Sequence, residues 1–199
     1  MKLILVLFFI AVSKFSIAHD PIEFNTQDIY IFGSLMNSDY QGKTMYQAIG
    51  LTPGVGIGSA ISGVKLGYGQ VYIEGGYNYL GTFGRVVYED NPPSRIYLYQ
   101  EEETLENLYV NFKVSYPLSD SILMNWKFGY SYLNSKYSAN DEFDREDSLN
   151  IPDKSYGQST SMAGLGVEYL INKNSSVLVE SINYGSGIRS LVASILFRL

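Results

Sequence analysis

The sequence is poor in histidine and cysteine, two residue types that often catalyse reactions or hold metal ions. Histidine is the usual general base near neutral pH, and the sequence has one, His19, close to the N-terminus. We interpret His19 as a terminal residue without a fixed partner. The chain has no Cys, which excludes disulfides and thiolate metal sites. A mechanism based on carboxylates alone stays formally open, but nothing in the sequence points to it. We therefore expect no enzyme activity, no cofactor and no metal.

Single charged residues that stand among small, polar or apolar neighbours are the next candidates for chemistry. They are Glu74, Lys113, Lys127, Glu168 and Glu180, with Arg198 as a sixth. Buried charges are tolerated only when they are paired and hydrogen-bonded. Because both signs occur, we expect a structural network of salt bridges, with an ion path or gate as the alternative. Either role requires elements that turn these residues toward one interior.

Two neighbouring segments alternate between apolar and polar residues, as β-strands do when their two faces meet different environments. Between 105 and 118 the apolar side reads Leu108, Val110, Phe112, Val114 and Tyr116. Between 122 and 132 it reads Ile122, Met124, Trp126, Phe128, Tyr130 and Tyr132. Each segment has the roughly 9–11 residues of a tilted transmembrane strand. The polar sides suit a narrow interior filled by side chains.

Six further strands are expected at 28–36, 53–67, 71–83, 159–171, 177–184 and 188–199, with the register of 53–67 left open. Short links alternate with long polar links at 37–52, 84–102 and 134–158, although the last link of the long kind, 184–187, is short. Outer-membrane barrels alternate short periplasmic turns with long external loops. The sequence thus predicts an all-β fold, an eight-stranded antiparallel transmembrane β-barrel with up-and-down topology.

The N-terminus and the composition fit an exported membrane protein. Lys2, the apolar run Leu3–Val12 and the small residues Ser16 and Ala18 predict a cleaved signal peptide at 1–18, followed by a barrel domain at 19–199. The apolar run is shorter than the ~20 residues of a spanning helix. The chain has 18 Tyr and a formal net charge of −6. An acidic chain of this kind argues against nucleic-acid binding.

Three glycine-containing runs stand out, 53–58 (PGVGIG), 71–81 (VYIEGGYNYLG) and 164–169 (GLGVEY). They resemble the second, third and sixth strands of small outer-membrane barrels of the outer-membrane protein A-like and opacity-protein type. The last strand resembles the family's insertion signal, although it ends in Leu199 where the family usually has Phe or Trp.

The resemblance implies location in the outer membrane of a Gram-negative bacterium. It also implies contact with membrane lipid and lipopolysaccharide, and insertion by the barrel-assembly machinery. The roles it implies are adhesion and colonisation, serum resistance or envelope integrity. Barrel enzymes of this membrane generally use a catalytic His, which this chain lacks within its strands.

The expected long loops hold the candidate contact residues for a host or cell-surface protein. Tyr97 and Tyr99 lie in the second long link, and Asp141, Phe143 and Asp144 lie in the acidic stretch of the third. Tyr-rich loops suit protein contacts, and tyrosines are equally typical of a membrane girdle. The acidic stretch lacks EF-hand spacing. We expect a solvated loop there, with divalent-cation bridging to lipopolysaccharide or a receptor contact as alternatives.

Two other functions remain open from the sequence. A secreted, lipocalin-like soluble barrel would turn its apolar face inward around a small apolar ligand. The alternating link lengths and the terminal strand argue against it. A small channel would use the charged interior as an ion path.

Overall fold

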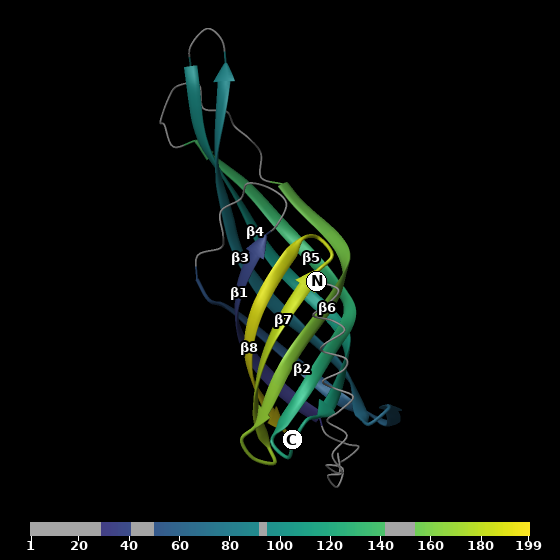
Figure 1. The fold of residues 1–199 in the computed structure, drawn as a ribbon. Helices are drawn as coiled ribbons and strands as arrows, with labels where there is room; N and C mark the ends of the chain where they lie inside the picture. Colours follow the sequence, from purple (N-terminus) through teal and green to yellow (C-terminus); the bar gives the residue numbers. More distant parts are fainter. Residues whose placement is uncertain (1–28, 41–49, 92–94, 142–153) are drawn as a thin grey trace, which may run out of the picture.

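The computed structural model describes residues 29–40, 50–91, 95–141 and 154–199. They form eight strands (Figure 1). The strands are β1 (Ile29–Tyr40), β2 (Thr52–Leu66), β3 (Gly69–Asn91), β4 (Arg95–Pro117), β5 (Ile122–Asp141), β6 (Lys154–Leu170), β7 (Ser175–Tyr184) and β8 (Ile188–Arg198). Within these described ranges no helix is long and apolar enough to cross a bilayer. The expected signal peptide at 1–18 lies outside them.

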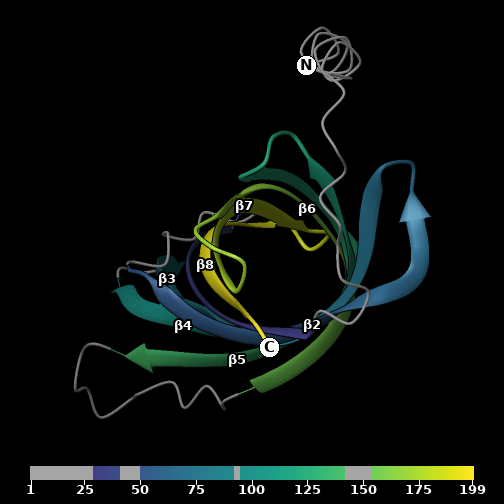
Figure 2. The same ribbon diagram turned by 90° about the horizontal axis from the view of Figure 1, so that it is seen from below.

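The strands form a closed antiparallel barrel. Each strand pairs with the next in sequence, and β1 pairs with β8, with Tyr30 opposite Arg198 and Tyr40 opposite Ile188. The view along the barrel shows the resulting ring (Figure 2). This confirms the eight-stranded up-and-down barrel predicted from the alternation. Closure gives the first and last strands a backbone partner on both sides, which a strand in lipid requires.

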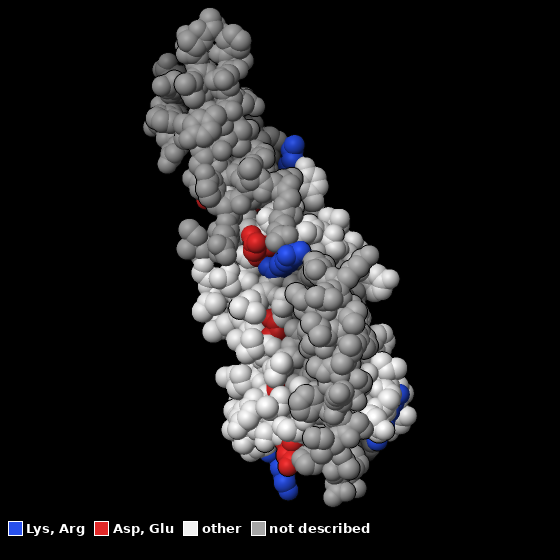
Figure 3. Space-filling model, viewed as in Figure 1, with Lys and Arg blue, Asp and Glu red and all other residues white. Residues whose placement is uncertain are grey.

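Side chains alternate between the interior and the exterior of the wall. Across the middle of the barrel the outward side chains are apolar or tyrosine, and we call this surface the apolar band. Its exposed members include Ile31, Leu35, Val55, Ile57, Ile73, Leu108, Val110, Phe112, Phe128, Leu165, Val167, Leu191, Ile195 and Phe197. On the described surface in view, basic residues lie near the middle of the molecule and near its lower end, with mostly uncharged surface between them (Figure 3).

Gly54, Gly56 and Gly58 of β2 face the interior, and their pairing with β1 defines the register of β2. Gly56 pairs with Phe32 and Gly58 pairs with Tyr30. A Cβ atom at either glycine would overlap the aromatic ring of its partner. Glycine at every second position therefore makes room for two β1 rings to lie across β2. Val55 consequently faces outward, as do its neighbours in the apolar band.

Three strands extend much farther than the sequence predicts. β3 and β4 have 23 residues each and remain paired up to Asn91 and Arg95. β5 continues to Asp141, which pairs with Tyr99 of β4. The prediction of a long loop at 84–102 was therefore wrong, and part of the predicted loop at 134–158 is strand. This sheet projects beyond the barrel (Figure 1). Both faces can meet water there, so the alternation that marks a strand in lipid is no longer required.

A β-bulge in β3 marks the beginning of the projection. The register with β4 shifts between Tyr79 and Gly81. Gly81 has φ of 110°, a conformation that favours glycine. The extra residue reverses the alternation, so that Leu80 and Phe83 both point inward and are fully buried.

Candidate functional site: the charged interior

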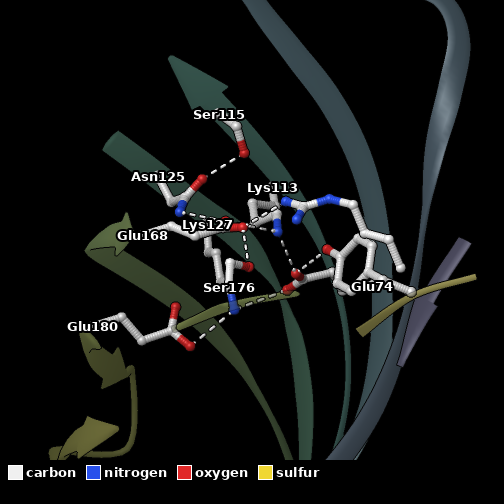
Figure 4. A network of polar contacts seen from close by, with 10 residues as sticks. Glu74, Lys113, Ser115, Asn125, Lys127, Glu168, Ser176 and Glu180 are labelled. Carbon is white, nitrogen blue, oxygen red and sulfur yellow. Dashed lines mark hydrogen bonds and ion pairs between the residues drawn. The ribbon is translucent and has the colours of Figure 1, made fainter. Parts of the chain in front are cut away.

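Glu74 on β3 lies at the centre of the charged interior. Its carboxylate accepts a hydrogen bond from the hydroxyl of Tyr30. Its Oε1 lies 3.3 Å from Nζ of Lys113, and its Oε2 lies 2.9 Å from Nζ of Lys127. Lys113 and Lys127 oppose each other on β4 and β5, where two like charges repel. A carboxylate shared by both ammonium groups offsets this repulsion (Figure 4).

Glu168 on β6 is the second centre, and four side chains surround its carboxylate. Oε1 lies 2.7 Å from Nη2 of Arg198 and accepts a 2.6 Å hydrogen bond from Oγ of Ser176. Oε2 accepts a 3.1 Å hydrogen bond from Nδ2 of Asn125 and lies 3.7 Å from Nζ of Lys113. Lys113 therefore links the two centres.

Glu180 on β7 completes the network through Lys127, whose Nζ lies 2.9 Å from its Oε1. The formal charges of Glu74, Glu168 and Glu180 cancel those of Lys113, Lys127 and Arg198. All but Arg198, whose side chain is 14% exposed, are almost fully buried. We call these six residues the interior network. Their mutual pairing meets the condition under which charges are tolerated inside a protein.

Aromatic rings of β1 and β3 add to the support of the two lysines. Nζ of Lys113 lies 4.3 Å from the ring centroid of Tyr30 and 4.9 Å from that of Tyr72. Nζ of Lys127 lies 5.7 Å from the ring centroid of Phe32. At these distances the ring faces attract a cation.

A mostly apolar layer occupies the interior between the network and the projecting sheet, with the buried side chains of Asn78 and Asn107 beside it. Its members are at most 4% exposed, and they are Met36, Leu80, Phe83, Leu105, Leu133, Met162, Ile182 and Tyr184. They belong to one contiguous cluster of buried side chains. Each lies farther along its strand toward the projecting end than the network residues do. The interior is thus filled by side chains at both levels.

The structure brings together all five charged residues singled out in the sequence. The reasoning from sequence missed Tyr30, Ser176 and Asn125 as their partners. Alternation places all three inside, but only the register across the closed barrel reveals which carboxylate each one reaches. Among the described residues, no group of His, Cys, Asp or Glu is suited to hold a metal ion.

The candidate contact residues lie elsewhere. Tyr97 and Tyr99 belong to β4, so their assignment to a loop was wrong, and Asp141 is the last residue of β5. Phe143 and Asp144 lie outside the described residues. The structure does not bring Tyr97, Tyr99 or Asp141 near the interior network, which occupies the barrel below the apolar layer.

Comparison with known proteins identifies the type of barrel. The family model of the outer membrane protein beta-barrel domain matches residues 4–188. No curated protein sequence matches the chain.

Solved structures with a similar fold include Neisserial surface protein A, at 11% identity and a TM-score of 0.53, covering 88% of this chain and 98% of that one. The N-terminal beta-barrel domain of OprF from Pseudomonas aeruginosa has 9% identity and a TM-score of 0.52, covering 87% and 99%. A major outer membrane protein from Thermus thermophilus has 12% identity and a TM-score of 0.50, covering 88% and 100%. At these identities the likeness shows the fold alone.

Proposed function

We propose that this chain, which belongs to the family of outer membrane protein beta-barrel domains, is a non-enzymatic scaffold that presents a projecting sheet for recognition at the cell surface. The protein is located in the outer membrane. In such barrels the short turns face the periplasm and the longer connections face outward. The projecting ends of β3, β4 and β5 therefore point away from the cell.

The length of the projection carries this proposal. A tilted strand needs only ~9–11 residues to cross the membrane, whereas β3 and β4 have 23 each. Their pairing continues from Thr82 and Thr104 to Asn91 and Arg95. The extra length contributes nothing to spanning, and it places Tyr97 and Tyr99 on a paired strand. Tyrosine is a common contact residue in protein recognition.

Side-chain contacts tie the base of the projection to the barrel wall. The hydroxyl of Thr82 on β3 lies 3.0 Å from those of Tyr79 and Thr104. On β5, Nζ of Lys136 lies 3.3 Å from Oε1 of Glu106 on β4. These contacts fix the base of the projection to the barrel wall. A surface held in this way loses little conformational entropy when a partner binds.

The interior supports a structural role over a catalytic one. Its charges are paired with one another, and the apolar layer separates them from the projecting end. A lipocalin-type barrel would have the reverse arrangement, with the apolar face around a cavity. We propose that the interior network stabilises the barrel and that recognition takes place outside it, with a host or cell-surface protein as the partner.

Shortening the projection tests this function. Phe83 and Glu103 oppose each other, so residues 84–102 can be replaced by Asn-Gly, which favours a two-residue hairpin turn. The measurement uses bacteria that display the protein on their surface. It counts how many of them adhere to epithelial cells and to immobilised serum and matrix proteins. We expect the full-length protein to confer adherence and the shortened one to fall to the level of bacteria without it.

Two controls accompany this experiment. An unboiled sample of the shortened protein must still run as the folded, heat-modifiable form, which separates lost recognition from lost folding. The second control is Arg189→Ala. Arg189 is exposed and lies next to the short β7–β8 connection, away from the projecting sheet, so this variant should keep full adherence. Equal adherence of the shortened and full-length proteins would refute recognition by the projecting sheet.

A further inference from the structure

A shallow groove of about 860 Å³ lies on the outer surface of β2 to β6. Gly75 forms its floor. In the ladder Gly75 stands between Ile57 and Val110, so one row across the apolar band lacks a side chain. Val55, Tyr77, Tyr130 and Tyr132 contribute to its walls.

The walls suit a hydrocarbon chain. The groove exposes far more apolar than polar surface, and Val55, Val110 and Tyr130 are exposed by 60%, 57% and 76%. All of these positions belong to the apolar band, which faces the bilayer. A groove there is filled by lipid tails, and a missing side chain gives one tail more contact with the protein than its neighbours have.

Polar groups stand directly above the groove, one step farther along the same strands. Tyr79, Glu106 and Asn134 occupy the next outward row, above Tyr77, Leu108 and Tyr132. Nδ2 of Asn134 donates to Oε2 of Glu106 at 3.3 Å. The ammonium group of Lys136 lies one row higher, and its side chain is 60% exposed. An ammonium has three donors, so pairing with Glu106 leaves Lys136 free to bind a phosphate.

The position of these groups identifies the leaflet. They lie on the side of the apolar band from which the sheet projects, which is the external side. The groove therefore faces the outer leaflet, where the lipid is lipopolysaccharide. Its lipid A part combines acyl chains with a phosphorylated sugar head, matching an apolar groove below and hydrogen-bonding groups above.

We propose that the groove over Gly75 binds one acyl chain of lipid A, with the lipid's phosphorylated head at the level of Lys136. The site belongs to the outer surface of the barrel, separate from the interior network, and it borders the base of the projecting sheet at Lys136.

Filling the groove tests the proposal. A Cβ atom at Gly75 would lie 3.5 Å from the carbonyl oxygen of Tyr109 and 4.0 Å from Cγ2 of Val110, which are ordinary contacts. Gly75→Leu should therefore fold and occupy the groove. Gly33→Leu is the matched control, because Gly33 also faces outward and a Cβ there would meet nothing within 4 Å.

The readout is native mass spectrometry of the mature protein in nanodiscs that contain lipid A and phosphatidylethanolamine. We expect one retained lipid A in the wild type and in Gly33→Leu, and at least about a tenfold loss in Gly75→Leu, equivalent to about 1.4 kcal/mol of binding. Lys136→Met should lower the preference for lipid A over phosphatidylethanolamine.

Three outcomes would overturn the proposal. If Gly75→Leu and Gly33→Leu retain lipid A equally, lipid A does not bind in the groove. Retention of phosphatidylethanolamine in place of lipid A would contradict the assignment of the head group. A dimer that Gly75→Leu abolishes would make the groove a contact between two copies of the chain.

Discussion

Lys127 contacts two carboxylates inside the barrel, those of Glu74 and Glu180. Replacing Lys127 with Met would leave Glu180 buried without this cation. Glu74 would keep Lys113 as its one neighbouring cation in the interior network. Breaking a buried ion pair on one side costs about 3–5 kcal/mol, since a charge stays behind in a poorly solvated place. We expect Lys127→Met to lower the free energy of unfolding by that amount, measured by urea unfolding in lipid vesicles with Trp126 fluorescence.

Lys136 supplies the control for this measurement, because its ion pair with Glu106 lies at the surface. Exposed pairs contribute about 0–1 kcal/mol, so Lys136→Met should change the free energy of unfolding by no more than that. If the two variants lose the same stability, the interior network does not have the structural role assigned to it.

Residue types alone predicted which charges lie inside, because Glu and Lys stand out among Gly, Ser and Asn on one side of a strand. Their pairing could not be predicted in the same way. Glu168 meets Arg198 because β6, β7 and β8 pair in one particular register, and alternation specifies a face without specifying the neighbour across it.

At the level of the strands, Gly129 of β5 is a position where two backbones approach closely. A Cβ atom there would overlap the main chain of Val110 and Asn111 on β4. Gly129→Ala therefore forces the strands apart, and overpacking of this kind costs about 1–3 kcal/mol. We expect a loss of that size in urea unfolding.

Gly164 of β6 is the matched comparison. A Cβ atom there would lie 3.4–3.5 Å from its nearest neighbours, Ile182, Ser181 and Lys127. Because alanine also restricts the unfolded chain more than glycine does, Gly164→Ala should stay within about 1 kcal/mol of the wild type. A larger loss for Gly164→Ala than for Gly129→Ala would contradict the close approach of β4 and β5.

The strands were predictable where lipid lies on one side and a filled interior on the other. This condition produces the alternation in 105–118 and 122–132, and the structure has β4 and β5 there. It fails at two places. In β2 several inward positions are glycines, which do not mark a polar or an apolar face. The sequence therefore leaves the register of β2 open, and the structure defines it through the rings of Tyr30 and Phe32. The projecting ends of β3, β4 and β5 have no lipid beside them, so the sequence predicts loops where the structure has strands.

At the scale of the whole molecule, side chains fill the barrel interior at the level of the interior network and at the level of the apolar layer. The interior network is internally paired, and above it the apolar layer has members no more than 4% exposed. Eight strands leave room for side chains and little more. We expect the purified protein to give no conductance steps above background in planar bilayers. Reproducible steps that disappear in Lys127→Met would establish instead that the charged interior is an ion path.

The pairing of β1 with β8 has a consequence for biogenesis. Leu199 donates a backbone hydrogen bond to the carbonyl of Ile29, and the first strand finds its second neighbour only in the residues of β8, the last of the eight strands. Until those residues have been synthesised and exported, the growing sheet has two bare edges, which attract other strands. Contacts between such distant parts of a chain also form slowly. This delay is the physical reason to expect a carrier in the periplasm and an insertion machine that holds both edges until they meet.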